Sequence, residues 1–287
     1  MTRLLIFGRT GQVATELRRR VPQGVSLQVL GRQEVDLTAP QAAAEAIAAS
    51  DANAVINAAA YTAVDQAEED EAQATTINAA APGAMARAAA AKGIPFVHVS
   101  TDYVFSGAGT RAWRPSDPVG PIGAYGRSKL AGEDAVRAAG GPHAIMRTSW
   151  VFSAHGNNFV KTMLRLSESR DRVSVVDDQV GGPTAAADIA DALFAQALGL
   201  LRDPATSGTY HFSNAPDVSW AGFAREIFAQ AGKSTEVVDI PSAEFPTKAA
   251  RPMNSRLDCT DIARVFDVAR PDWRASLADV LQELGAA

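Results

Sequence analysis

Short apolar runs and helix-like periodic stretches alternate along the first half of the chain. Apolar runs bounded by turn residues predict strands at 4–7, 26–30, 54–57, 96–99 and 144–147. Between them, stretches with helical spacing predict helices at about 12–20, 41–49, 72–92 and 124–137. This alternation is typical of a parallel sheet with helices on both faces. We therefore expect an α/β fold built on a Rossmann-type doubly wound parallel sheet.

A glycine-containing turn joins the first predicted strand to the first predicted helix. It has the spacing G-x-x-G-x-x-A, ending at Ala14. Glycines let the backbone approach a pyrophosphate, which the free N–H groups of a helix N-terminus hold. A lone glycine triplet is often only a turn, but its place here predicts a dinucleotide site. The expected cofactor residues in the turn are Gly8, Arg9, Thr10, Gly11, Gln12 and Val13.

The end of the second predicted strand bears on the choice of cofactor. NAD-selective sites usually have an acidic residue there to bind the ribose 2′-hydroxyl, but this chain has Gly31-Arg32. Together with Arg9, Arg32 would suit a 2′-phosphate. We expect NADPH to be preferred and NADH to be possible; the alternative is that both arginines are merely solvated.

Two further stretches complete the expected cofactor site. Asp36 and Leu37 are expected beside the adenine. Small residues directly after a parallel strand let a cofactor lie against the backbone, and here these are Ala58, Ala59 and Ala60.

The stretch from Ser100 to Lys129 carries the candidate chemistry. Thr101 ends the fourth predicted strand, and Tyr125 and Lys129 lie four residues apart on one helix face. A nearby ammonium lowers the pKa of a phenol, which is ordinarily near 10. We expect Tyr125 to donate a proton to a carbonyl oxygen that receives a hydride at carbon, while Thr101 hydrogen-bonds that oxygen. The alternative for the Tyr-x-x-x-Lys pair is a simple helix-surface contact.

The residues at the strand ends support a ligand site more strongly than any single motif does. Gly8, Asn57, Thr101 and Thr148 each lie at or just after a predicted strand end. Ligands of such folds bind outside the carboxyl ends of the strands. These residues are therefore expected on one edge of the sheet. The acidic stretch from Asp65 to Glu71 is expected to be a solvated helix start.

The remainder of the chain predicts a smaller second part. Expected elements are helices at about 157–166, 188–201 and 220–231, a strand at 173–176, a short strand and turn at 208–214, and a C-terminal helix pair between 261 and 284. We expect residues 1–150 to form an NAD(P)-binding Rossmann domain. Residues 151–287 are expected to form a smaller C-terminal α/β substrate-binding part whose segments may return to the first domain. A basic loop between Arg251 and Arg256 suits a diphosphate.

Composition narrows the function classes. Apolar residues make up 47% of the chain and charged residues 21%, as in an ordinary globular protein. A net charge of -5 disfavours nucleic-acid binding through phosphate contacts. One cysteine, Cys259, and four histidines without ligand spacing predict neither a disulfide nor a metal site. No apolar run is long enough to span a membrane, and no signal peptide is seen. We expect a cytoplasmic protein with no nucleic-acid or membrane partner.

Several longer motifs make the chain similar to a known family. It resembles the extended short-chain dehydrogenase/reductases and, among them, the dTDP-4-dehydrorhamnose reductases. The matching stretches are Gly8–Val13, Asn57–Asp65, Ser100–Phe105, Tyr125–Glu133, Arg147–Phe152, Gly156–Phe159, Asp178–Thr184 and Arg251–Leu257.

The resemblance implies a reaction and roles for individual residues. The reaction is reduction of the C4 keto group of dTDP-4-dehydro-6-deoxy-L-mannose to dTDP-L-rhamnose with NADPH or NADH. Thr101, Tyr125 and Lys129 match the catalytic triad, and Tyr125 and Lys129 also contact the cofactor. The implied substrate-binding residues are Thr101, Asp102, Tyr103, Trp150, Asn158 and Arg251, with Trp150 beside the sugar.

The chain departs from the family pattern at one point. Some members form a dimer that shares a magnesium ion through glutamates. Glu16 fits one such position, whereas Ala187 stands at the other. We expect no metal, and either a monomer or a homodimer.

Two other functions remain open. One is a different nucleotide-sugar reductase or an epimerase on the same scaffold; an epimerase would keep its NAD without net consumption. The other is a non-catalytic regulatory subunit that resembles the one of methionine adenosyltransferase. The intact Thr101, Tyr125 and Lys129 favour an enzyme.

Overall fold

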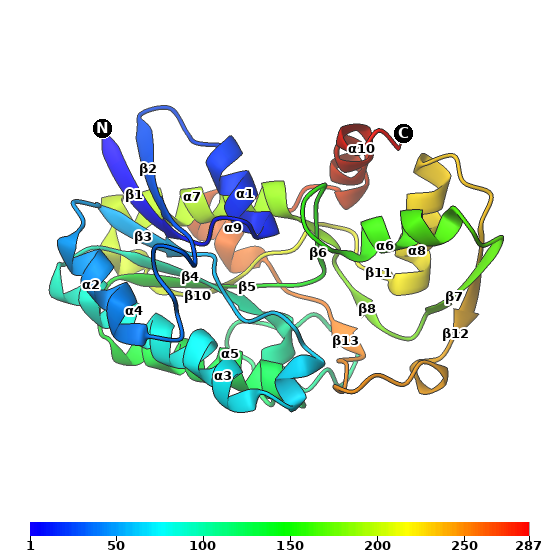
Figure 1. Cartoon of the computed structure of the whole chain (residues 1–287), viewed down its shortest axis with the longest axis horizontal. Coiled ribbons are helices and arrows are strands. Elements are labelled where there is room, and N and C mark those ends of the chain that lie inside the picture. The colour runs from blue at the N-terminus through cyan, green and yellow to red at the C-terminus, as the bar shows by residue number, and fades with distance from the viewer. Residues whose placement is uncertain (287) are drawn as a thin grey trace.

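The computed structural model describes residues 1–286. A six-stranded sheet lies at its centre, in the order β10-β5-β4-β3-β1-β2, with all neighbours parallel (Figure 1). Its strands are β1 (Thr2–Phe7), β2 (Val25–Leu30), β3 (Ala54–Asn57), β4 (Phe96–Thr101), β5 (His143–Thr148) and β10 (Gly208–His211). The expected Rossmann-type parallel sheet is confirmed.

Helices cover both faces of this sheet (Figure 1). Along β1, Leu4 and Ile6 pack with helices on one face, and Leu5 and Phe7 pack with those on the other. Burial on both faces is why these strands have continuous apolar sequences rather than alternating ones. The first face carries α1 (Gln12–Arg19), α7 (Ala186–Arg202) and α9 (Thr260–Phe266); the second carries α2 (Pro40–Ala49), α4 (Ala81–Ala91) and α5 (Ala124–Ala138).

A second lobe lies beside the sheet, on the right of Figure 1, around its own apolar cluster. Its helices are α6 (Phe159–Ser167), α8 (Trp220–Gln230) and α10 (Trp273–Glu283). Its short sheets pair β6 (Val151–Phe152) with β9 (Thr184–Ala185), β7 (Arg172–Val176) with β12 (Glu236–Ile240), and β8 (Val180–Gly181) with β11 (Val218–Ser219) and β13 (Asn254–Ser255). Three elements that follow residue 150, namely α7, β10 and α9, belong to the central sheet and its helical cover.

The helices are modest in length. The longest within residues 1–286 is α7, with 17 residues. None of the helices in this described range is both long and apolar enough to cross a membrane.

The helix predicted at 72–92 is interrupted by a wider turn. It consists of α3 (Glu71–Thr75), a π-helical turn at Thr76–Ala80, and α4. Asn78 lies in that turn and is buried. Its side chain accepts a hydrogen bond from Tyr61 N at 2.8 Å and donates to Tyr61 O and Ser128 Oγ, both at 3.0 Å. Tyr61 and Ser128 lie far from Asn78 in the sequence. The local alanine-rich sequence therefore predicts a regular helix and does not indicate the wider turn.

The helix α5, which carries Tyr125 and Lys129, packs very closely on its neighbours at two glycines. A Cβ atom added to Gly126 would lie 2.2 Å from Tyr103 O, and one added to Gly132 would lie 2.0 Å from Asn78 O. Only glycine permits such approaches. The helix that carries the two candidate catalytic side chains is therefore held close to its neighbours at one point between Tyr125 and Lys129 and at another just after Lys129.

We predict that Gly132→Ala destabilises the protein by about 1–3 kcal/mol, because overpacking of this size forces the backbone apart. Urea unfolding measures the change. Gly120→Ala is the matched control, since its new Cβ would lie at an ordinary 3.8 Å from Ser106 Cβ. Equal stability of the two variants would show that α5 is not held this close.

Candidate active site

A large cleft opens at the carboxyl edge of the central sheet. Strand order reverses there, because β2 lies on one side of β1 and β3 on the other, and the loops that follow these strands diverge. The cleft has a volume of about 770 Å³. It is lined by every residue predicted for the cofactor: Gly8, Arg9, Thr10, Gly11, Gln12, Val13, Arg32, Asp36, Leu37, Ala58, Ala59, Ala60, Tyr125 and Lys129.

Part of the wall comes from a loop that the sequence analysis did not assign to the cofactor site. Gly156 and Asn157, between β6 and α6, line the cleft opposite the glycine-containing turn. Ser153 Oγ and Asn158 Nδ2 both donate to Gln12 Oε1, at 2.8 and 3.0 Å. More than 130 positions separate these partners, so no local pattern signals the contact.

Asn158 itself caps the N-terminus of α6 rather than lining the cleft. Its Oδ1 accepts from Lys161 N at 3.2 Å, which caps the first turn of α6. It is not among the residues that line the cleft, whereas its neighbour Asn157 is. Its expected contact with substrate stays a prediction.

The three candidate catalytic residues line the cleft together. Thr101 is the last residue of β4; its Oγ1 donates to Asp102 Oδ1 at 3.0 Å and accepts from Tyr103 N at 3.2 Å. Lys129 is buried, and its Nζ donates to Val99 O at 2.7 Å. The end of β4 and the first two turns of α5 thus bring a hydroxyl, a phenol and an ammonium into one site.

The pKa of Tyr125 differs from the expectation. Burial raises this pKa above its ordinary value; the negative charge of Asp102 raises it further, and a hydrogen bond with Thr101 opposes the rise. The expected lowering by Lys129 is wrong for this structure, because the ammonium is turned toward Val99 O. Burial also lowers the pKa of Lys129, to about 8, against the opposing charge of Glu133. Tyr125 therefore keeps its proton over the ordinary pH range, as a proton donor must.

The acidic stretch from Asp65 to Glu71 has a structural role at the start of α5. Glu68 Oε1 accepts a hydrogen bond from Ala124 N at 2.8 Å, which satisfies a free donor at the helix N-terminus. Glu71 binds the Arg127 guanidinium at 2.7 and 2.8 Å. The stretch does begin a helix, as expected, since α3 starts at Glu71, whose side chain is partly exposed. Its contacts with α5 were not expected, because those partners lie more than 50 residues away.

Asp102 is a buried carboxyl group in the wall of the cleft. Its exposed fraction is 3%, and within residues 1–286 its Oδ2 has no hydrogen-bond partner. Burial raises the pKa of Asp102 to about 6, although hydrogen bonds from Ser255 and Thr101 oppose the rise. Asp102 and Tyr103, both predicted to bind substrate, line the cleft.

Trp150, predicted beside the sugar, lines the cleft in an unusual backbone conformation. Its φ is 48°, a left-handed value that is uncommon for a residue with a side chain. Its ring stacks on Trp220, with 3.6 Å between the ring centroids and 11° between the planes. Strain of this kind is often found at functional sites. Trp220 lies 70 positions further along the chain and was not identified from the sequence.

The two arginines expected at a diphosphate lie outside the wall of the cleft. Arg251 Nη2 forms an ion pair with Asp65 Oδ2 at 2.7 Å, and its Nη1 donates to Tyr103 Oη at 3.3 Å. Arg256 Nη1 donates to Asn254 Oδ1 at 3.0 Å. Arg251 thus connects the basic loop to Tyr103 in the cleft wall, and its role toward a diphosphate stays a prediction.

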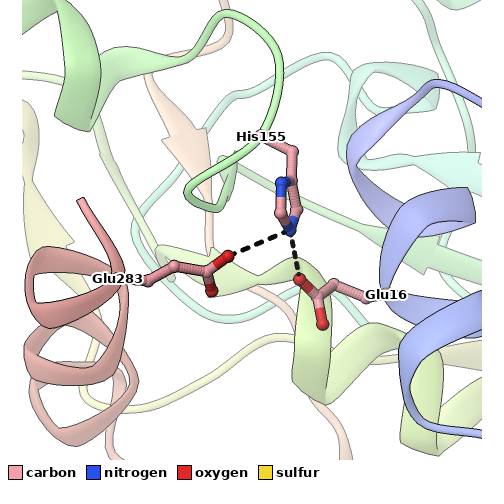
Figure 2. Close-up of side chains that lie close together, drawn as sticks. All are labelled: Glu16, His155 and Glu283. Atoms are coloured by element: carbon pink, nitrogen blue, oxygen red, sulfur yellow. Dashed lines mark hydrogen bonds and ion pairs between the residues drawn. The ribbon is translucent and has the colours of Figure 1, made fainter.

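Glu16 belongs to a cluster between the lobes that also contains His155 and Glu283 (Figure 2). His155 Nε2 lies 2.9 Å from Glu16 Oε1 and 3.7 Å from Glu283 Oε1. Arg19 Nη1 lies 2.7 Å from the same His155 nitrogen and 3.6 Å from Glu16 Oε1, and it pairs with Glu283.

These residues do not fit a magnesium ion. Magnesium requires near-octahedral oxygen ligands, whereas a guanidinium already lies between these carboxylates, and Ala187 offers no ligand atom. The cluster instead connects α1, the loop before α6, and α10 (Figure 2).

We predict that the stability of Asp102→Asn relative to the natural chain depends on pH. The folded protein holds the Asp102 proton up to about pH 6, whereas the unfolded chain releases it near 3.8. The destabilisation caused by Asp102 therefore grows as the pH rises between these values. Relative to the natural chain, the variant should gain roughly 1 kcal/mol in free energy of unfolding between pH 5 and pH 8.

Urea unfolding at the two pH values measures this effect. Asp117→Asn is the control, because Arg111 holds the pKa of Asp117 at about 2 and the group is ionised in both states over this range. Any change that Asp117→Asn causes in the free energy of unfolding, relative to the natural chain, should be the same at pH 5 and pH 8. If Asp102→Asn also changed the free energy of unfolding equally at both pH values, the raised pKa of Asp102 would be contradicted.

We also predict that millimolar magnesium and EDTA leave the melting temperature unchanged, because Arg19 already supplies the positive charge in the Glu16 cluster. Thermal unfolding measures this directly. A rise of the melting temperature with magnesium, lost in Glu16→Gln, would show that the ion displaces Arg19.

Comparisons with known proteins agree with this geometry. The family model described as RmlD substrate binding domain matches residues 1–286. The dTDP-4-dehydrorhamnose reductase of Sinorhizobium fredii is 42% identical over 280 residues, which cover 96% of this chain and 95% of the relative. The crystal structure of a dTDP-4-dehydrorhamnose reductase from Clostridium acetobutylicum has a TM-score of 0.92 and 36% identity, covering 99% of this chain and all of the other.

A solved dTDP-4-dehydrorhamnose reductase from Bacillus anthracis, in complex with NADP, has a TM-score of 0.91 and 34% identity over 99% of this chain and all of the other. The similarity therefore spans both lobes and extends to sequence as well as fold. It confirms the resemblance seen in the motifs. This chain belongs to the dTDP-4-dehydrorhamnose reductase family of oxidoreductases.

Proposed function

We propose that this protein reduces the C4 keto group of dTDP-4-dehydro-6-deoxy-L-mannose to give dTDP-L-rhamnose, with NADPH as the preferred cofactor and NADH as a possible one. The observation that carries the proposal is one cleft lined by the glycine-containing turn and by Thr101, Tyr125 and Lys129. Family membership supports the substrate class, because relatives that match nearly the whole chain are named for this reaction.

The residues of the cleft fit a dinucleotide. The N-terminus of α1 has Gly11 at its cap position with no side-chain hydrogen bond, so the N–H groups of its first turn remain available to a pyrophosphate. Arg32 lies at the end of β2, where the 2′-phosphate of NADPH would need a cation. When bound, the nicotinamide supplies the hydride for the reduction.

The side chains of the site supply the proton that the reduced oxygen requires. Tyr125, which keeps its proton because its pKa is raised, donates it to the substrate O4 as negative charge develops there. The Thr101 hydroxyl hydrogen-bonds the same oxygen. Lys129, with a pKa of about 8, is positively charged at neutral pH and would contact the cofactor from the wall of the cleft.

The substrate would lie toward the second lobe. Trp150, held by its stack on Trp220, offers an aromatic surface to the apolar face of a deoxysugar. Asp102 and Tyr103 provide polar groups in the same cleft, and Asn158 and Arg251 would act at its margin. In this proposal residues 1–150 form the cofactor domain and residues 151–287 the substrate part, with α7, β10 and α9 returning to the first domain. The protein would act in the cytoplasm as a monomer or homodimer, without a metal.

We predict that Tyr125→Phe lowers kcat about 10²–10⁴-fold, the usual contribution of a general acid, and changes the Kd for NADPH little. Steady-state kinetics and titration calorimetry measure the two quantities. Tyr61→Phe is the matched control: Tyr61 packs in the same small apolar cluster as Tyr125 but does not line the cleft. A kcat unchanged in Tyr125→Phe would refute the role of Tyr125.

The proposed reaction is tested by oxidation of NADPH in the presence of dTDP-4-dehydro-L-rhamnose. Substrate-dependent loss of NADPH with formation of dTDP-L-rhamnose is the expected result. Interconversion of sugar nucleotides without net cofactor consumption would instead indicate an epimerase. Tight NADPH binding with no turnover of several sugar nucleotides would indicate a regulatory subunit.

A further inference from the structure

A tight turn follows β2 and folds the chain back over the strand end. The N–H groups of Glu34 and Val35 donate to Gly31 O at 3.1 and 2.9 Å. The Glu34 carboxylate then accepts a hydrogen bond from Gly31 N through Oε2, at 2.8 Å. The turn thus places a carboxylate beside the residue that directly follows β2.

This carboxylate lies where a longer residue at position 31 would place its side chain. A Cβ atom added to Gly31 would be 3.2 Å from Glu34 Oε2 and 3.0 Å from Arg9 Cβ. The second oxygen, Glu34 Oε1, lies 2.8 Å from Arg9 Nη2, which also donates to Val29 O at 2.8 Å. The strand end therefore has an acidic group after all, supplied from three positions further along the chain. Glu34 lies directly behind the cleft wall, because Arg9 and Gly31, which it binds, line the cleft while Glu34 itself does not.

The two arginines at this end of the cleft are consequently not equivalent. Arg9 is already engaged by Glu34 and Val29. Arg32 is exposed, and within residues 1–286 its side chain makes no hydrogen bond or ion pair. Arg32 is thus available to a 2′-phosphate, whereas Arg9 is available only if Glu34 releases it.

We propose that Glu34 sets the relative affinity of this protein for NADPH and NADH. The inference rests on the proposed function, because it assumes that the cleft binds a nicotinamide dinucleotide. The Glu34 carboxylate can accept a hydrogen bond from a ribose 2′-hydroxyl while its ion pair with Arg9 stays intact. A 2′-phosphate meets the same negative charge and competes with it for Arg9. Glu34 therefore favours NADH and restrains the preference for NADPH that Arg32 provides.

The test is titration calorimetry of the full chain with NADPH and with NADH, without sugar substrate. We expect Glu34→Gln to raise the ratio of the NADH Kd to the NADPH Kd about five- to tenfold, mainly through tighter NADPH binding, because one partly exposed ion pair with Arg9 is released. Arg32→Ala should change the ratio in the opposite direction.

Glu236→Gln is the matched control. Glu236 also pairs with an arginine, Arg172, at 2.8 Å between exposed side chains, and its loss changes the net charge equally. Glu236 lies on β12 and Arg172 on β7, and neither strand of this pair contributes a residue to the cleft, so the Kd ratio should stay as in the natural chain.

The outcomes separate the two proposals. If the natural chain binds both dinucleotides and Glu34→Gln leaves the ratio unchanged, or changes it no more than Glu236→Gln does, the role of Glu34 is overturned and the proposed function stands. If the natural chain binds neither dinucleotide, the proposed function is overturned together with this inference.

Discussion

The candidate site depends on a buried ion pair that fixes α5 to the central sheet. Glu133 is fully buried, and its carboxylate binds Arg147 at 2.8 and 2.7 Å and Ser100 Oγ at 2.6 Å. Breaking such a pair by removing one partner is strongly destabilising, because the other charge stays buried. Ser100 immediately precedes Thr101, and Glu133 lies one helical turn from Lys129. The same interaction that secures the helix therefore sets the separation of the candidate catalytic groups.

A second set of polar contacts holds the lobes around the cleft. Gln12, in the glycine-containing turn, accepts hydrogen bonds from Ser153 and Asn158 of the second lobe. The cluster of Glu16, His155 and Glu283 lies between α1, the loop before α6 and α10 (Figure 2), and Arg19 of α1 pairs with Glu283 of α10. These contacts join the glycine-containing turn on one side of the cleft to the second lobe on the other. Polar contacts of this kind are compatible with small relative movements of the lobes.

Electrostatics in the cleft follow from burial and from charge pairing more than from residue type. Asp102 and Tyr125 both have raised pKa values because they are removed from water. Arg9 and Arg251 look like free cations in the sequence, yet Glu34 and Asp65 bind them. The charge that a ligand would meet is therefore smaller than a count of arginines suggests.

The sequence by itself determined the sheet, the glycine-containing turn and the candidate trio of Thr101, Tyr125 and Lys129. These features depend on local signals: apolar runs, glycine spacing and a helical i, i+4 pair. Tertiary structure alone decided which polar groups meet. The π-helical turn at Asn78, the stack of Trp220 on Trp150 and the capping of α5 by Glu68 join residues 17 to 70 positions apart. Local patterns cannot report such pairs, because each is defined by the packing of whole elements rather than by the spacing of neighbouring residues.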